Sequence, residues 1–365
     1  MNRDTEAKTP RPSWHAGIES FRVLAAFAII LIHAKYFVNQ PPFTYHSYAY
    51  LFMDCFNRFS VPFYFLTAGY FFYGSCEKGN SPGRVFRRTA GKLLLLYAAW
   101  TVIYAAVPRD IVGGIQQQGI VQGLLSGGSD QIHRSWWRFR SHPLYYLFES
   151  TSIHLWFLPA LLCGLGLLTL FVKARAERYL LPAAILLYLF GMAASSYKST
   201  ALGIHLPFLF DGKDGPFTST LHVAVGWMFA KHNVRVSLNK ALLLVLAGYG
   251  LCLMENLAVR PFLSEPLPLN VAASHVLLGA AMFLTALALP EAGKAHAARL
   301  GPYTLGIYLA QFLAGNLIWR LYVYFPPAAW EIFFPVLIFC VSAAAVMALS
   351  KTRAAWLVSR VRKNA

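Results

Sequence analysis

The stretch "SFRVLAAFAIILIH", residues 20–33, places one arginine and one histidine at the two ends of ten uncharged residues. An α-helix turns about 100° per residue, so Arg22 and His33 lie on the same helix face, about 16 Å apart along the axis. Glu19 precedes Arg22 by three residues, shares this face and can pair with it. The stretch therefore predicts an apolar helix with one polar face that packs against protein or water.

The composition of the whole chain indicates that this helix lies in a membrane. Of its 365 residues, 57% are hydrophobic and 13% are charged, and the mean hydropathy is +0.48. Soluble domains carry about 25% charged residues, so the fraction of charged residues in this chain is about half of what two soluble domains of this total length would have. Five cysteines have no metal-type spacing, and we expect no metal site.

Stretches of about 20 mostly apolar residues, the length that crosses a bilayer, recur along the chain. Helices satisfy their own backbone groups in lipid, so we predict an all-α, polytopic membrane protein. The domain boundaries that follow are an N-terminal tail, 1–16, a membrane domain, 17–350, and a basic C-terminal tail, 351–365. The ten predicted spans are 17–38, 48–73, 89–107, 152–172, 179–197, 217–231, 240–257, 270–290, 301–324 and 330–350.

The basic residues predict the direction in which the chain crosses the membrane. The two tails and the loops on their side hold 21 of the 32 Lys and Arg, and the loops on the opposite side hold 7. Loops rich in Lys and Arg stay in the cytoplasm, so we expect both termini there. The net charge of +17 then reflects topology and anionic lipid, and a nucleic-acid partner is unnecessary.

The longest predicted outer segment, 108–150, has two unlike halves. The first half contains "GGIQQQGIVQGLLSGGS", which we expect to form a short helix bounded by glycines. The second contains "HRSWWRFRSHPLYY", in which tryptophan alternates with arginine. This pattern fits an interfacial anchor or a lid that contacts a sugar.

Ionisable side chains inside the predicted spans suggest a hydrated cavity. Each costs about 2.5–3.5 kcal/mol at the centre of a membrane helix, and such residues are therefore candidates for function. For His33 considered alone, two interpretations remain open: a buried structural histidine and a catalytic base. Asp54 and Arg58, four residues apart, can neutralise each other, and Pro62 predicts a kink beside them. Other polar residues within the spans are His154, His222, Glu255, Asn256, His275, Gln311, Asn316 and Arg320.

A basic cluster precedes the third predicted span, in "GRVFRRTAGKLLLLYAAW". As a signal for cytoplasmic loops it needs no further role. Alternatively it binds a polyphosphate, because arginine side chains match phosphate oxygens with paired hydrogen bonds. Its members are Arg84, Arg87, Arg88 and Lys92.

These stretches together, in this order, resemble the acyltransferase 3 family of bacterial membrane acyltransferases. Arg22 and His33 match its arginine–ten residues–histidine motif, and "RFSVPFYFLTAGYFF" at 58–72 is similar to its second-span pattern. "HLWFLPALL" at 154–162 resembles the family signature around Trp156, and "LGPYTLGIYLAQ" at 300–311 resembles the late span. Relatives commonly end this last motif in histidine, whereas this chain has Gln311.

The resemblance implies transfer of an acyl group, usually acetyl, from cytoplasmic acetyl-CoA or another acyl-CoA to a hydroxyl group. The acceptor would be a surface carbohydrate, a lipid-linked sugar or a small molecule, and the location the bacterial inner membrane. We expect His33 to act as general base, by itself or through a transient acyl-histidine, because imidazole exchanges protons near neutral pH. Arg22 and the basic cluster would bind the CoA phosphates. The residues assigned to the acceptor side or the cavity are Glu19, Asp54, Arg58, His154, Trp156 and Gln311.

Two other functions remain open from the sequence. A transporter or flippase would use the same polar face as part of a substrate path. A scaffold that senses a lipid or ligand would need no turnover. Release of free thiol from acetyl-CoA would distinguish the enzyme from the carrier, and a scaffold would tolerate the joint replacement of His33 and Arg22 with little loss of function.

Overall fold

The computed structural model describes residues 15–35, 44, 47–205, 211–262, 268–289 and 296–358. These residues form helices and connecting turns, with no strand among them, as the composition predicted. The predicted N-terminal tail lies almost wholly outside the described residues. Six helical stretches are long and apolar enough to cross a membrane: Ala16–Ala34, Pro82–Gln118, Ile153–Lys173, Glu177–Ala194, Leu238–Phe262 and Pro327–Leu349.

Each of the ten stretches predicted as spans contains a helix, but they differ in length. α10 (Pro216–Lys231) and α12 (Ala273–Ala288) have only 16 residues each, so the count of ten spans and the orientation remain predictions.

The α-helices are α1 (Ala16–Ala34), α2 (Tyr48–Asn57), α3 (Ser60–Glu77), α4 (Pro82–Ala106), α5 (Ile111–Gln118), α6 (Ile120–Ser141), α7 (Pro143–Phe148), α8 (Phe157–Lys173), α9 (Leu180–Ala194), α10 (Pro216–Lys231), α11 (Leu238–Val259), α12 (Ala273–Ala288), α13 (Thr304–Ile318) and α14 (Pro327–Leu349). Short 3-10 helices are η1 (Ile153–Trp156), η2 (Glu177–Tyr179), η3 (Arg260–Phe262), η4 (His296–Tyr303), η5 (Trp319–Tyr324) and η6 (Arg353–Leu357).

The second predicted span is divided into two helices, not continuous. α2 ends at Asn57 and α3 begins at Ser60, so the chain breaks where we expected a kink. Pro62 lies in the first turn of α3, where its missing N–H costs little because first-turn donors have no helical partner. The break places Arg58 between two helix ends, beside the cavity described below.

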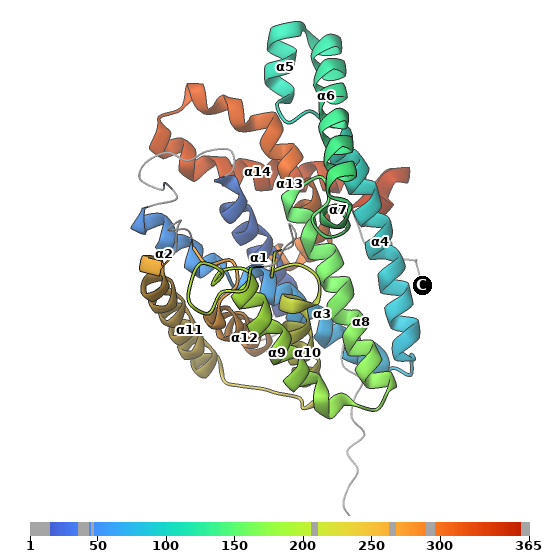
Figure 1. Ribbon diagram of the computed structural model, residues 1–365, viewed down its shortest axis with the longest axis vertical. Coiled ribbons are helices and arrows are strands. Elements are labelled where there is room, and N and C mark those ends of the chain that lie inside the picture. Colours follow the sequence, from blue (N-terminus) through green and yellow to red (C-terminus); the bar gives the residue numbers. More distant parts are fainter. Residues whose placement is uncertain are drawn as a thin grey trace, which may run out of the picture.

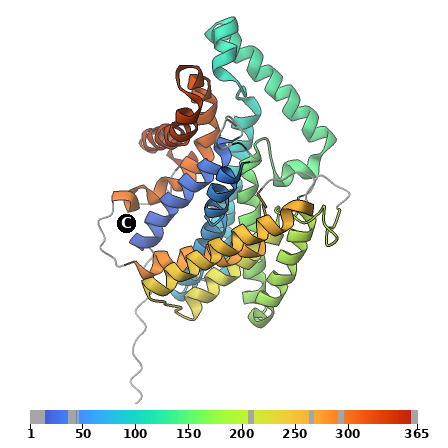
Figure 2. The ribbon, with the colours of Figure 1, turned by 90° about the vertical axis from the view of Figure 1, so that its left-hand side faces the viewer.

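α1 lies inside the bundle and contacts α2, α3, α12, α13 and α14 (Figures 1 and 2). α3 packs closely against α10 because both helices have glycine at the crossing. A Cβ on Gly69 would overlap the carbonyl oxygen of Val223, and one on Gly226 would overlap that of Leu66. Small residues of this kind let membrane helices approach at backbone distance. This crossing fixes α3 and α10, which both line the candidate site.

α5 and α6 form a hairpin that projects from the bundle (Figures 1 and 2). Gly119 joins them with a φ of +79°, a conformation that favours glycine. The stretch expected to form one short helix bounded by glycines, 113–129, is divided at Gly119 between α5 and the first half of α6. The Trp-Arg segment continues as the second half of α6 and exposes Trp136 and Trp137. Asp110 ties the hairpin to η5, because Oδ1 accepts a 2.9 Å hydrogen bond from Nε of Arg320.

The segment after α14 packs back onto the bundle. Trp100 Nε1 donates a 3.1 Å hydrogen bond to the carbonyl oxygen of Leu357, and Val358 is 3% exposed. These two residues fall in the predicted C-terminal tail, 351–365, so the compact unit extends past residue 350. Residues 359–365 lie outside the described part of the chain.

Candidate active site

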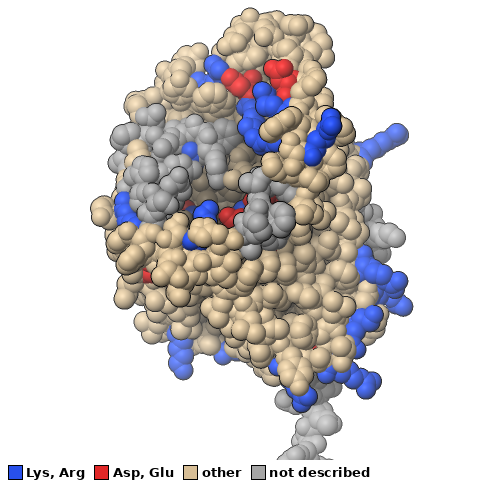
Figure 3. All heavy atoms as spheres, in the orientation of Figure 1, with Lys and Arg blue, Asp and Glu red and all other residues tan. Residues whose placement is uncertain are grey.

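Arg22 and His33 lie toward opposite ends of α1, each beside a different cavity. We name the cavity at Arg22 the inner pocket and the cavity at His33 the outer pocket, following the predicted direction of α1. Their volumes are about 250 Å³ and about 270 Å³. The face of the molecule shown in Figure 3 is hollowed near its centre, and charged side chains of both signs lie in the hollow.

The inner pocket has two cations in a largely apolar wall. Arg22 and Lys92 line it together with Tyr64, Thr67 and Leu161. Glu19 does not line the pocket but holds Arg22, with a carboxylate oxygen 2.9 Å from Nη1. Tyr64 donates a 2.6 Å hydrogen bond to the carbonyl oxygen of Arg22. These contacts fix the arginine at the pocket wall.

The other members of the predicted basic cluster do not reach the inner pocket. Arg84, Arg87 and Arg88 are exposed on the first turns of α4, one to two turns before Lys92. Only Lys92 of that cluster is a lining residue. The structure thus brings Arg22 and Lys92 together and leaves the three arginines on the surface of the same helix.

The outer pocket contains His33, Arg58 and Trp156, which the sequence had suggested separately. Asp54 is fully buried behind Arg58, with Oδ2 2.5 Å from Nε, and so acts on the pocket only through that arginine. Nη1 of Arg58 donates a 2.9 Å hydrogen bond to Oδ1 of Asn270, which also lines the pocket.

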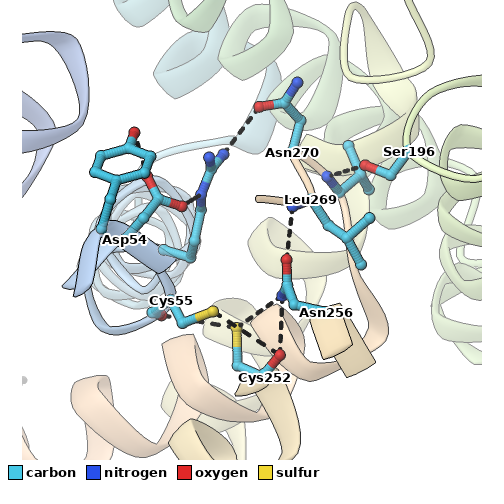
Figure 4. Close-up of polar contacts among 10 residues, drawn as sticks. Asp54, Cys55, Ser196, Cys252, Asn256, Leu269 and Asn270 are labelled. Carbon is cyan, nitrogen blue, oxygen red and sulfur yellow. Dashed lines mark hydrogen bonds and ion pairs between the residues drawn. The ribbon is translucent and has the colours of Figure 1, made fainter. Parts of the chain in front are cut away.

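The position of Asn270 is set by the backbone on either side of it (Figure 4). Leu269 N donates a 2.8 Å hydrogen bond to Oδ1 of Asn256, and Val271 N donates one of 2.8 Å to Oγ of Ser196. α11 and the turn that follows α9 therefore hold this connecting segment beside Arg58. Asn256 was visible in the sequence as a polar residue in a span, but its role as a clamp was not.

The hydrogen bonds of Gln311 define which nitrogen of His33 carries a proton. Gln311 Nε2 donates a 3.0 Å hydrogen bond to the carbonyl oxygen of Tyr308, so Oε1 faces His33, at 3.2 Å from Nδ1. An amide oxygen can only accept, and Nδ1 must therefore be the protonated nitrogen. In the neutral ring, Nε2 then carries the lone pair of electrons.

His154 lies beside His33 but lines neither pocket. Its ring centroid is 6.2 Å from that of His33, and it stacks on Phe312 at 4.6 Å with an interplanar angle of 6°. Ser152 Oγ lies 2.9 Å from Nδ1. The contacts make His154 a packing partner of the His33 region and not a group in contact with a bound molecule.

Two residues line both pockets, namely Ile29 and Tyr308. Ile29 lies one helical turn before His33, and Tyr308 is the residue to which Gln311 donates. The Tyr308 hydroxyl donates to the carbonyl oxygen of His154. The two side chains form a wall shared by the inner pocket and the outer pocket, next to His33.

A charged cluster that the sequence analysis did not identify closes one side of the outer pocket. Lys213 lines the pocket and pairs with Glu149, and its Nζ is 3.6 Å from Asp214 and 3.8 Å from Asp211. Nζ also lies 6.0 Å from the centre of the Trp156 ring. In the sequence, the short run "DGKDG" at 211–215 could have indicated this charged cluster, but only the fold shows that Glu149 joins it.

The charges in this cluster change one another's proton affinity. Burial opposes the charge of Lys213, but Asp211, Asp214 and Glu149 outweigh it and raise the pKa of the ammonium group. Burial raises the pKa of Asp214 to about 7, although Lys213 acts in the opposite direction. The lysine is therefore firmly cationic and already neutralised by its neighbours.

The sequence analysis also left Ser60, His222, His275 and Tyr308 without a position in the site. His222 and His275 were visible as polar residues in spans, yet nothing in their spacing linked them to Arg58 or His33. All four line the outer pocket. Within the described residues, no group of three His, Cys, Asp or Glu side chains is arranged to hold a metal ion.

Comparison with known proteins gives relatives of a different overall length. Two amino-acid racemases of Enterococcus faecalis are 26% identical, one over 186 residues, or 50% of this chain and 22% of the relative. A serine/alanine racemase of Enterococcus gallinarum is 26% identical over 259 residues, or 67% of this chain and 33% of the relative. The matched stretches thus cover at most a third of these proteins. No solved structure matches the chain.

The sequence profile of one family covers nearly all of the described structure. The profile, described as an acyltransferase domain, matches residues 15–350, from the start of α1 to the end of α14. That range includes Arg22, His33 and every residue that lines the two pockets except Leu357 and Val358 of the inner pocket. The chain therefore belongs to the acyltransferase 3 family, as a membrane protein with an acyltransferase domain.

Proposed function

We propose that the protein transfers an acyl group, most simply acetyl, from cytoplasmic acyl-CoA to a hydroxyl group, in the bacterial inner membrane. The observation that carries this proposal is the wall of Ile29 and Tyr308, which separates two pockets beside His33. A reaction between two substrates that arrive from opposite sides needs such an arrangement. The inner pocket would receive the donor, and the outer pocket would receive the acceptor.

The inner pocket suits a thioester arm attached to a polyphosphate. Its wall is mostly apolar, while Arg22 and Lys92 supply positive charge. Arginine binds phosphate oxygens with paired hydrogen bonds, and lysine attracts them as a point charge. Arg84, Arg87 and Arg88, exposed on the same helix as Lys92, would attract the nucleotide part before it binds. The pantetheine arm would then carry the acyl group toward Tyr308.

His33 is placed to act as the base. Its Nε2 would take the proton from the acceptor hydroxyl as that oxygen attacks the thioester carbonyl carbon. The carbon–sulfur bond then breaks, and the imidazolium returns the proton to the leaving sulfur, which gives an ester and free CoA. General base catalysis of this kind contributes about 10²–10⁴-fold. Gln311 keeps the ring in the required tautomer but, unlike a carboxylate, brings no charge to stabilise the imidazolium.

The test uses purified protein in lipid nanodiscs, acetyl-CoA, and a polysaccharide and small-molecule extract from cells that lack the gene. We expect thiol release that depends on the extract, together with an acetylated product detected by mass spectrometry. His33→Ala should lose nearly all of this activity, and His133→Ala, at an exposed histidine of α6, should retain it. Full activity of a well-folded His33→Ala protein would exclude His33 as the base.

The two pockets on either side of one wall also fit a carrier, the second candidate function. A carrier for a small polar or lipid-linked substrate would bind a component of the extract and move it across the wall. It would release no thiol from acetyl-CoA. If thiol release is completely absent while the extract component is still transported into proteoliposomes, the protein is a carrier and not an acyltransferase.

A further inference from the structure

Cys55 of α2 and Cys252 of α11 point toward each other inside the protein (Figure 4). Each sulfur lies against the backbone of the other residue: Sγ of Cys55 is 3.9 Å from the carbonyl oxygen of Cys252, and Sγ of Cys252 is 3.7 Å from that of Cys55. Both residues are 0% exposed, and both thiols are free. A disulfide needs side chains that face each other, and this pair meets that condition.

The remaining cysteines do not share this arrangement. Cys76, Cys163 and Cys340 lie on α3, α8 and α14, and each is at least partly exposed. Among the described residues, contacts between two cysteines occur only at Cys55 and Cys252. Each of these two lies seven residues, or about 10 Å, from the helix end that we predict to face outward, so both have the same depth.

His275 connects this thiol pair to the outer pocket. Its side chain interacts with the Cys252 thiol, as does that of Ser274. His275 also lines the outer pocket, and within the described residues its Nε2 is buried without a hydrogen-bond partner. A buried polar atom of this kind is costly unless a bound molecule completes its hydrogen bonding. The outer pocket thus gives a small polar molecule a route to the histidine beside Cys252.

The surroundings indicate which oxidant can reach the pair. A protein oxidant cannot contact thiols that are 0% exposed. Hydrogen peroxide is small and uncharged, and it enters a cavity of about 270 Å³ without difficulty. It both donates and accepts hydrogen bonds, so it suits Nε2 of His275. A second thiol next to the oxidised one is the arrangement that converts a sulfenic acid into a disulfide.

We propose that Cys55 and Cys252 are a redox-active thiol pair that hydrogen peroxide oxidises to a disulfide. The Cys252 thiol gives its proton to His275, and the sulfur attacks one peroxide oxygen. The O–O bond breaks, and the leaving hydroxide takes the proton from His275 to become water, which leaves Cys252 as a sulfenic acid. The sulfur of Cys55 then attacks that of Cys252, the S–O bond breaks, and the released hydroxide takes the Cys55 proton. Two thiols and one peroxide thus give one disulfide and two waters.

The disulfide would join the two helices that support Arg58 and its neighbours. Asn256, the clamp of the connecting segment described above, donates a 2.8 Å hydrogen bond to the carbonyl oxygen of Cys252 and lies 3.7 Å from its Sγ. Asp54, which pairs with Arg58, directly precedes Cys55. A bond between the sulfurs therefore ties α2 to α11 directly behind the outer pocket.

The first experiment uses the full chain in phosphatidylcholine nanodiscs, with Cys76, Cys163 and Cys340 replaced by serine. This two-cysteine protein is treated with hydrogen peroxide and then catalase, denatured and labelled with N-ethylmaleimide. We expect both thiols to lose their label, the unlabelled mass to fall by two hydrogens, and dithiothreitol to restore both labels. Full labelling after peroxide would overturn the pair.

The wild-type protein provides the same answer without any substitution. Digested without reduction after peroxide treatment, it should yield a peptide that links Cys55 to Cys252. Links from either residue to Cys76, Cys163 or Cys340 in place of this one would overturn the assignment.

Single variants of the two-cysteine protein separate the steps. In Cys55→Ser, Cys252 should stop at the sulfenic acid, which dimedone traps. In Cys252→Ser, Cys55 should stay mostly reduced, because His275 interacts with Cys252. His275→Phe should slow disulfide formation several-fold, whereas His222→Phe, a matched change on another helix of the same pocket, should not. Equal rates in both histidine variants would remove His275 from the reaction.

The cross-link also has a physical readout that needs no label. It spans 197 residues of chain, and bonds that close long loops restrict the unfolded chain most. The oxidised two-cysteine protein should melt several degrees above the reduced one, and peroxide should not shift the melting temperature of Cys55→Ser. Equal melting temperatures would overturn the link between the helices. His33→Ala should oxidise like the wild type, so loss of acyl transfer and loss of the thiol pair are separate results.

Discussion

Gln311 is hydrogen-bonded to His33 across 3.2 Å, and its own amide nitrogen is held by the carbonyl oxygen of Tyr308. The contact joins α13 to α1 at the wall between the two pockets. It shows that Gln311, at the position where the family resemblance leads us to expect histidine, contacts the proposed base. A side chain that can accept a hydrogen bond from Nδ1 is the feature that both residue types share.

Replacement of Gln311 therefore tests a positioning role. Gln311→Leu should lower kcat about tenfold or more while leaving the KM for acetyl-CoA nearly unchanged, because the Nδ1 proton loses its acceptor. Gln311→His should recover much of the activity, since a ring nitrogen can accept in its place. Steady-state kinetics and a pH–rate profile check both variants. A Gln311→Leu protein with wild-type kcat and pH profile would show that the contact is only structural.

Tyr308 should keep water and the acceptor away from the thioester until both substrates are bound. Tyr308→Ala would remove most of the wall between the pockets, so we expect thiol release without acceptor to rise several-fold relative to ester formation. Tyr308→Phe keeps the ring and loses only the hydroxyl bond to the carbonyl oxygen of His154. In the Tyr308→Phe protein, thiol release should therefore remain coupled to ester formation. Parallel assays of thiol and acetylated product measure the ratio, and equal ratios in all three proteins would contradict a barrier role.

The sequence could predict the features that depend on local spacing. The eleven-residue interval between Arg22 and His33 fixes a shared helix face, and the i, i+4 interval between Asp54 and Arg58 fixes their pairing. Pro62 marked the break between α2 and α3. In each case the relevant geometry lies within a few helical turns, where backbone periodicity determines it.

The features that depend on tertiary packing could not be read from spacing. Ser60, His222 and His275 come from three helices, and their convergence depends on the glycine crossing of α3 and α10. Glu149 joins Lys213 across 64 residues. For the basic cluster, the sequence predicted too many pocket residues. Spacing grouped Arg84, Arg87 and Arg88 with Lys92, but the rotation of α4 brings only Lys92 to the inner pocket.

The buried pair of Asp54 and Arg58 gives a prediction about stability. Asp54→Ala would leave the arginine charge without its carboxylate partner, which costs about 3–5 kcal/mol in buried pairs. The double variant Asp54→Leu/Arg58→Leu should be less destabilised than Asp54→Ala, because it removes both charges together. Thermal unfolding of the detergent-solubilised proteins, followed by tryptophan fluorescence, compares the three. An Asp54→Ala protein as stable as wild type would show that the pair is accessible to water.

The cluster around Lys213 gives a prediction about pH. Burial raises the pKa of Asp214 to about 7, whereas an unfolded aspartate has a pKa of about 3.9. Between these values the folded protein binds a proton that the unfolded chain releases, so the contribution to stability is present below about pH 4 and is lost as pH rises through about 7. Lys213 stays cationic over this pH range in both the folded and the unfolded state, so it adds nothing to the pH dependence of stability. The melting temperature should therefore fall between pH 5 and pH 8 in the wild type and fall less in Asp214→Asn, where no carboxyl titrates. The same slope in both proteins would show that another group causes it.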